Sequence, residues 1–214
     1  DAGSAMAFGV TDNVYIGNSA GKDNTDGYNN TFIGSGAGAY SQGSNSVYIG
    51  TGAGLNTTSG SANVFIGVDS GMDNSSGQRN VFVGRDTGKY NGTGSDNTFI
   101  GDGAGAYNTV GTDNTSIGIF AGGINGTGSN NTNLGSSANF FNTSGSRNTI
   151  LGMEAGLGTA LFTDYSDNVF VGYQTGYANR TGNQNTFVGT QAGISNTTGT
   201  SNTYTGYKAG YGIA

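Results

Sequence analysis

The chain has 214 residues, of which 43 are Gly, and it contains no Pro, Cys, His or Trp. Its net charge of −6 comes from 13 acidic and 7 basic residues. This much Gly without Pro excludes collagen, and the lack of His and Cys excludes Ser-His or Cys-His nucleophile pairs and ordinary zinc sites. The basic residues never cluster, and no apolar run approaches the roughly 20 residues of a membrane helix. We therefore expect neither nucleic-acid binding nor membrane insertion.

A five-residue phrase recurs twelve times: Asn, Thr or Val, Phe or Tyr, Ile or Val, and Gly, with small departures. Successive phrases start 17 residues apart, except for one step of 16 and one of 20, at Asn13, Asn30, Ser46, Asn63, Asn80, Asn97, Asn114, Asn131, Asn148, Asn168, Asn185 and Asn202. Such a period is typical of a solenoid in which each repeat forms one coil. We predict an all-β parallel β-solenoid (β-roll) of about twelve 17-residue coils. Residues 13–214 form a single repeat domain, and residues 1–12 are a degenerate N-terminal coil or an assembly segment.

Each repeat is numbered here from its first residue. Positions 1 to 4 are rich in β-branched and aromatic residues and predict a short strand, at 13–16, 30–33, 46–49, 63–66, 80–83, 97–100, 114–117, 131–134, 148–151, 168–171, 185–188 and 202–205. Gly at position 5 in every copy, and at position 9 in all but Asn139, indicates a tight corner. The aliphatic position 4 is expected to face the interior together with position 2, opposite a small residue at position 8. The Asn at position 1 is expected to form a stacked ladder.

Position 3 is aromatic in most copies, and neighbouring strand residues point to opposite faces. If position 4 faces inward, position 3 faces outward as an apolar stripe, and such a stripe favours self-association. The residues predicted to carry this self-assembly are Tyr15, Phe32, Tyr48, Phe65, Phe82, Phe99, Phe170, Phe187 and Tyr204.

The repeat is irregular in the middle of the chain. Position 3 becomes Ser116 and Asn133 in the seventh and eighth copies, Phe140 and Phe141 follow, and the ninth copy gains three residues around 158–162. We interpret this as a local change in coil packing, with an outward loop.

Few side chains suggest chemistry. Glu154 is the only Glu, and the Asp residues fall at differing repeat positions. We therefore expect no catalytic residue, no cofactor and no enzyme activity. Asp23 with Asp26, or Asp69 with Asp73, could contribute to a weak calcium site, but solvated acids in turns are the better interpretation.

Asn-x-Ser/Thr sequons are frequent in the turn that ends each repeat. They mark candidate glycosylation sites, but we favour the interpretation that they arise by chance in a turn rich in Asn and Thr. The residues concerned are Asn56, Asn74, Asn91, Asn125, Asn142, Asn179 and Asn196.

The segment Asn30-Thr31-Phe32-Ile33-Gly34, followed by Ala37-Gly38, resembles two groups of repeats. One is the head repeat of trimeric autotransporter adhesins. The other, closer and covering roughly residues 13 to 210, is the N-T-x-I-G…A…N-T-T-G-S repeat of bacterial and phage tail-fibre-like surface proteins. The resemblance implies a parallel β-roll, often trimeric, on an extracellular fibre, and it identifies no catalytic residue.

These features predict a structural subunit of an extracellular or cell-surface filament or fibre shaft. Its partner is expected to be itself, in a lateral oligomer, a head-to-tail filament or both. One alternative is a surface adhesin head that binds a host or environmental ligand. A third is an ice-binding solenoid, because Thr recurs at position 2.

Overall fold

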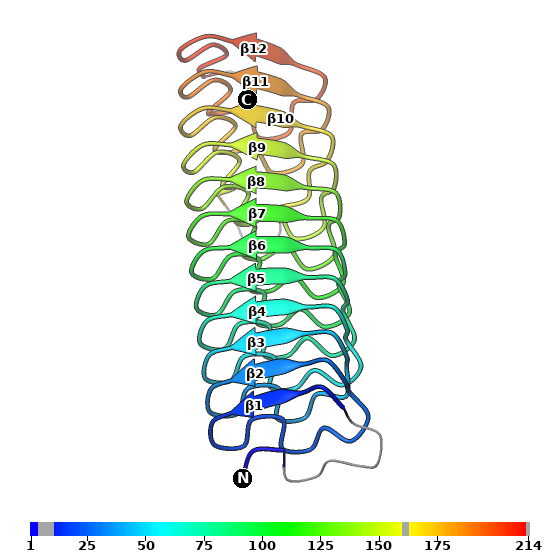
Figure 1. Cartoon of the computed structure of the whole chain (residues 1–214). Coiled ribbons are helices and arrows are strands. Elements are labelled where there is room, and N and C mark those ends of the chain that lie inside the picture. The colour runs from blue at the N-terminus through cyan, green and yellow to red at the C-terminus, as the bar shows by residue number, and fades with distance from the viewer. Residues whose placement is uncertain (4–10, 160–162, 213–214) are drawn as a thin grey trace.

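The computed structural model describes residues 1–3, 11–159 and 163–212, and it is a stack of coils with one short strand in each (Figure 1). The strands are β1 (Val14–Ile16), β2 (Thr31–Ile33), β3 (Val47–Ile49), β4 (Val64–Ile66), β5 (Val81–Val83), β6 (Thr98–Ile100), β7 (Thr115–Ile117), β8 (Thr132–Leu134), β9 (Thr149–Leu151), β10 (Val169–Val171), β11 (Thr186–Val188) and β12 (Thr203–Thr205). They form one parallel sheet in sequence order. Coils are numbered here by their strands, so that coil 1 contains β1.

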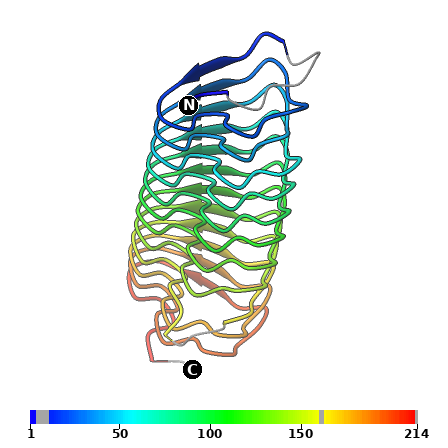
Figure 2. The ribbon, with the colours of Figure 1, turned by 90° about the horizontal axis from the view of Figure 1, so that it is seen from below.

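The predicted fold class is confirmed. All neighbouring strands pair in register, so that Phe65 of β4 lies beside Phe82 of β5 and Phe82 beside Phe99 of β6. None of the described residues is helical. Each strand covers positions 2 to 4 only, because the backbone N–H at position 1 donates to an Asn side chain of the preceding coil rather than to a backbone carbonyl, as from Asn80 to Asn63. The two termini lie at opposite ends of the stack (Figure 2).

Gly is required at position 5 by close approach between coils and by its backbone conformation. This Gly has a φ between 120° and 139° throughout, a range that residues with a side chain rarely adopt. A Cβ atom at Gly67 would lie 2.3 Å from the carbonyl oxygen of Gly84 in the next coil. Position 5 is therefore Gly in all twelve copies because two backbones meet there.

The interior of the solenoid is filled by the aromatic side chains of position 3. Phe32, Tyr48, Phe65 and Phe82 have no exposed surface, and consecutive rings stack with centroids 4.6 to 5.0 Å apart between Phe32 and Phe99. The small residues of position 8 are buried with them. The predicted facing of the strand is therefore wrong: position 3 points inward, and positions 2 and 4 point outward.

Two columns of buried Asn side chains hold the coils in register. At position 1, the backbone N–H of Asn80 donates to Oδ1 of Asn63 over 2.9 Å, and Nδ2 of Asn63 donates to the carbonyl of Gly77 in its own coil. At position 12, Nδ2 of Asn91 donates to Oδ1 of Asn74 over 2.6 Å. The ladder predicted at position 1 is confirmed, and the ladder at position 12 is an addition to it.

Coil 9 departs from the others because of its three additional residues. Tyr165 stands where other coils carry a Gly three residues before the next Asn, and its ring is fully buried beside Phe170. It fills space that the smaller Ile150 leaves at position 3, and its hydroxyl donates to Oδ1 of Asn139 over 2.6 Å. Residues 160–162 of the predicted outward loop lie outside the described residues, as do residues 4–10 of the predicted N-terminal segment.

Candidate functional site

The outward face of the sheet is formed by positions 2 and 4 of every coil. These 24 residues comprise 16 aliphatic residues and eight Thr residues, with no charged or amide side chain among them. Many are well exposed, including Ile16 at 57%, Ile66 at 37% and Leu134 at 48%. We call this surface the sheet face, and it consists of Val14, Ile16, Thr31, Ile33, Val47, Ile49, Val64, Ile66, Val81, Val83, Thr98, Ile100, Thr115, Ile117, Thr132, Leu134, Thr149, Leu151, Val169, Val171, Thr186, Val188, Thr203 and Thr205.

Uninterrupted strand pairing makes the sheet face continuous. Twelve strands in register at about 4.8 Å spacing give a face about 53 Å long, and three strand residues give it a width of about 10 Å. Single exposed apolar residues are normal on protein surfaces, but a contiguous apolar patch of this size marks an interaction site.

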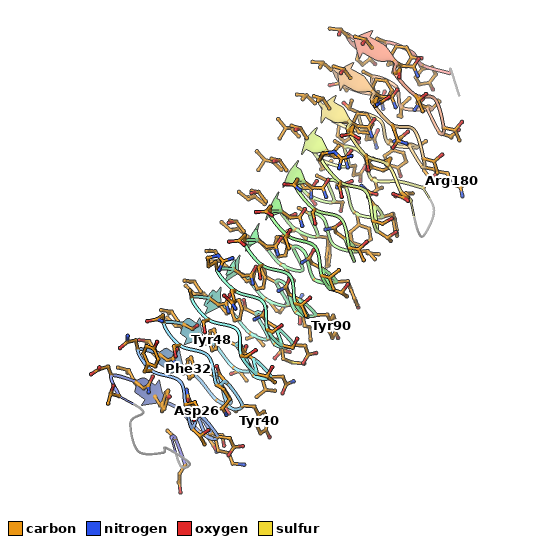
Figure 3. The ribbon with its side chains drawn as sticks, turned by 90° about the vertical axis from the view of Figure 1, so that its right-hand side faces the viewer. Asp26, Phe32, Tyr40, Tyr48, Tyr90 and Arg180 are labelled. Carbon is orange, nitrogen blue, oxygen red and sulfur yellow. The ribbon has the colours of Figure 1, made fainter. Side chains whose placement is uncertain are left out.

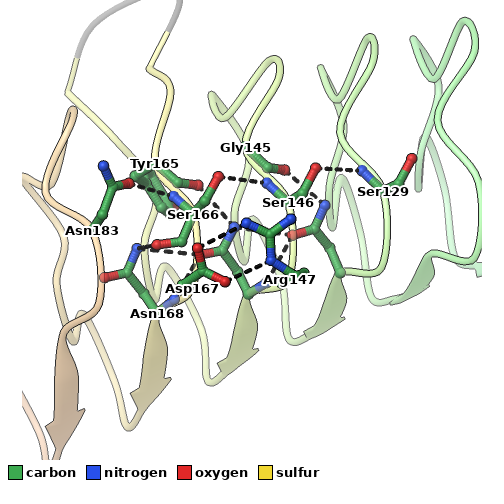
Figure 4. A network of polar contacts seen from close by, with 11 residues as sticks. Ser129, Gly145, Ser146, Arg147, Tyr165, Ser166, Asp167, Asn168 and Asn183 are labelled. Carbon is green, nitrogen blue, oxygen red and sulfur yellow. Dashed lines mark hydrogen bonds and ion pairs between the residues drawn. The ribbon is translucent and has the colours of Figure 1, made fainter.

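Polar side chains border the sheet face on the side where each strand begins. Ser146 and Ser166 accept hydrogen bonds from the backbone N–H groups of Ser129 and Ser146 (Figure 4). Beside them, Nε of Arg147 lies 2.6 Å from Oδ1 of Asp167. The hydrogen bond from the guanidinium of Arg147 holds the pKa of Asp167 below its usual value.

A second ion pair of the same kind links Arg79 to Asp96 over 2.6 Å, one coil apart. These pairs are solvent-exposed and contribute little to stability. These ion pairs lie beside the uncharged sheet face. Protein interfaces have a similar arrangement, in which an apolar centre is bordered by a polar rim.

The residues predicted to mediate self-assembly do not lie on the surface. Seven are fully or almost fully buried in the interior: Phe32, Tyr48, Phe65, Phe82, Phe99, Phe170 and Phe187. Tyr15 and Tyr204, in the first and last coils, are partly buried and pack against the same interior. The aromatic residues of position 3 therefore do not form an outward stripe. The exposed apolar surface is formed instead by positions 2 and 4, which flank position 3 in each strand.

Six of the seven candidate glycosylation sites are also buried. Their Asn side chains have exposures of at most 3% and belong to the ladder at position 12: Asn74, Asn91, Asn125, Asn142, Asn179 and Asn196. An attached glycan would not fit inside the coil, and this burial favours a chance origin of these six sequons. Asn56 is half-buried, and its Nδ2 donates to Oδ1 of Asp73 over 2.6 Å.

Two of the four acidic residues considered for calcium, Asp69 and Asp73, have other partners nearby. Oδ2 of Asp69 lies 3.2 Å from Nζ of Lys89, and Asp73 accepts the bond from Asn56. Within the described parts of the chain, no three His, Cys, Asp or Glu side chains gather as a metal site would need. The same residues include no helix long and apolar enough to cross a membrane. Weak calcium binding and the absence of a cofactor stay predictions.

Comparison with protein-family models, with curated proteins and with solved structures found no match to this chain. The geometry therefore defines a class of architecture, a repeat protein built as a parallel β-solenoid with inner Asn ladders and aromatic stacks.

Proposed function

We propose that this chain is a structural segment of an extracellular fibre shaft and that copies of it associate laterally through the sheet face. The observation that carries the proposal is the uncharged, exposed and continuous face formed by positions 2 and 4. Surfaces of this kind are costly to leave in water, because apolar area contributes about 25 cal/mol per Å² when it is buried.

The size of the sheet face supports a second copy of the chain as its partner. Two faces of about 53 by 10 Å, laid together, remove about 1,000 Å² from water, which reaches the lower bound for a specific interface. Two such sheets pack through interdigitated aliphatic side chains about 10 Å apart. The resemblance of the repeat to tail-fibre-like surface proteins favours the same arrangement and an extracellular location.

The test introduces charge on the sheet face in alternate coils. The triple variant Ile66→Lys/Ile100→Lys/Leu134→Lys places three ammonium groups on the sheet face, and their aliphatic stems keep covering the strands. We expect the parent to form oligomers in sedimentation velocity and the variant to sediment as a monomer. The matched control, Ser76→Lys/Val110→Lys/Ser144→Lys, adds the same charge at position 14, in the turn of the same coils, and should remain oligomeric.

Circular dichroism and thermal melting verify that both triple variants are folded. A parent that is monomeric at all concentrations, or a folded sheet-face variant that associates as well as the control, would overturn the proposal.

Ice binding is a second candidate function, because Thr98, Thr115, Thr132 and Thr149 stand in one outward column on consecutive strands. The second column of that face is aliphatic rather than Thr. Thermal hysteresis of a dilute solution separates this function from fibre assembly, which predicts none.

A further inference from the structure

A cleft of about 310 Å³ opens on a different side of coils 5 to 7 from the sheet face. Its floor consists of two small residues of coil 6, Gly103 and Ala106. Coil 5 contributes Asp86 and Lys89 to one wall, and coil 7 contributes Phe120 to the other. The cleft therefore spans two coil steps, about 10 Å at 4.8 Å each, which accommodates one ring-shaped ligand group between the walls.

Phe120 departs from the repeat and lies outside the core, where its ring makes an edge contact with Phe140 at a centroid distance of 6.0 Å. It occupies position 7, where all other coils carry Gly, Ser, Asp, Glu, Gln or Lys. Its φ of 55° is strained for a bulky residue, and its ring remains 44% exposed. The ring leans over Gly103, because a Cβ atom built on that residue would lie 2.5 Å from the ring. The chain thus keeps an aromatic surface at the cleft despite the local conformational cost.

The polar groups of the cleft are fixed by ion pairs within and between coils. Arg85 of coil 5 pairs with Asp102 of coil 6 over 2.8 Å, and Lys89 pairs with Asp86 of its own coil over 2.8 Å. Lys89 also lies 3.2 Å from Asp69. These five residues carry two positive and three negative charges, so the local sum of −1 disfavours an anionic ligand. Each paired carboxylate retains lone pairs that accept hydrogen bonds from hydroxyl groups.

We propose that this cleft binds one residue of a neutral saccharide. The apolar C–H face of a pyranose ring would lie against Phe120, and its hydroxyl groups would donate to Asp86 and Asp102 and accept from Lys89. A small concave site with an aromatic wall and a few convergent polar groups has the general anatomy of a ligand site. Tyr107, at the mouth of the cleft and 53% exposed, would contact the next sugar residue. The inference is independent of lateral association and gives the fibre a recognition site.

The test uses a printed array of neutral and acidic glycans, probed with the full chain and followed by titration of the best neutral glycan. Phe120→Gly removes the aromatic wall and relieves the strained φ, so it should fold at least as well as the parent. Ala106→Leu places a larger side chain on the floor of the cleft. Leu is compatible with the fold at this position, because Leu55 occupies position 10 of coil 3. We expect each variant to weaken binding at least tenfold.

Two matched controls repeat these changes outside the cleft. Ser137→Gly alters position 7 of coil 8, and Ala39→Leu alters position 10 of coil 2; both should bind like the parent. Binding to no glycan, binding to acidic glycans only, or neutral-glycan binding that survives both cleft variants would overturn the proposal. None of these outcomes affects the sedimentation test of the sheet face.

Discussion

At the scale of single residues, position 9 shows why a repeat as degenerate as this one keeps an almost invariant Gly. Gly38 has a φ of 55°, and a Cβ atom there would lie 2.5 Å from the ring of Phe32. The residue is therefore constrained twice, by its backbone conformation and by the aromatic ring that fills the interior.

We predict that Gly38→Ala destabilises the protein by about 2 to 5 kcal/mol. About 1 to 2 kcal/mol comes from the left-handed conformation, and the rest comes from overpacking against the ring. Gly36→Ala in the same coil is the matched control, since its φ is 69° and its nearest neighbour is a flexible Leu55 methyl at 3.3 Å. Urea unfolding of both variants measures the difference, and equal losses of stability would contradict a steric role for the ring.

At the scale of the coil, a change of residue at position 3 is accompanied by changes at positions 1 and 12, which lie around the same side chain. Tyr48 is the one fully buried Tyr of the aromatic column, and its coil carries Ser46 in place of the usual Asn at position 1. Ser41 and Thr57 replace Asn at position 12 nearby. These smaller side chains surround the Tyr48 hydroxyl, although none of them meets the geometry of a hydrogen bond to it.

We predict that stability falls at alkaline pH because of the buried tyrosines. Burial raises the pKa of Tyr48, and burial also raises the pKa of Tyr15 to about 12. Since an unfolded tyrosine ionises near pH 10, the full stability is present below that pH. It is lost as pH rises toward the folded pKa, by about 1.4 kcal/mol per pH unit for the fully buried Tyr48 and by less for the partly exposed Tyr15.

Tyr48→Phe tests the prediction, because it removes an unpaired buried hydroxyl as well as the titration. Urea unfolding should show unchanged or higher stability at pH 8 and a shallower decline between pH 10 and 11. Tyr40→Phe, at an exposed site shown in Figure 3 on the edge away from the strands, is the control. A decline that is the same in the parent and in the Tyr48 variant would exclude Tyr48 as its source.

The sequence predicted the strands, the corners and the first Asn ladder, but it did not settle which face of the strand is buried. Positions 3 and 4 are both apolar, and strand alternation allows either one to face inward. A signal was nevertheless present, because Asn139, the only residue other than Gly at position 9, falls in a coil whose position 3 is Asn133 rather than an aromatic. Gly at position 9 and an aromatic at position 3 belong together because the ring needs the space.

The period of the repeat also predicts part of the surface chemistry. Residues 17 apart become neighbours in adjacent coils, as in the pairs Arg79–Asp96 and Arg85–Asp102. The cleft could not be predicted in this way, because it depends on how the Phe120 ring leans over Gly103, and a period alone gives no side-chain direction.

At the scale of the whole molecule, each coil packs only on its neighbours, so stability is a sum of interfaces between coils. The apolar interior consists of two clusters, one from Tyr15 to Ala104 and one from Ala138 to Tyr204. Between them lie Ser116 and Asn133, whose side chains share one hydrogen bond of 3.0 Å, while Oδ1 of Asn133 has no partner. Backbone pairing and the ladder at position 1 continue across this boundary, but aromatic stacking does not.

We therefore predict that the two halves unfold in separate transitions, with hydrogen exchange fastest in coils 7 and 8. Ser116→Phe/Asn133→Leu should join the two clusters. Gly122 leaves room for a ring at position 3 of coil 7, whereas Asn139 restricts coil 8 to an aliphatic side chain. In urea unfolding followed by circular dichroism, the parent should show two transitions and the double variant one, at higher urea. The prediction would be contradicted by a parent that unfolds in one step, with uniform exchange protection along the stack. In that case the hydrogen-bond ladders alone would couple the coils, and the gap in the aromatic column would have no effect on the cooperativity of unfolding.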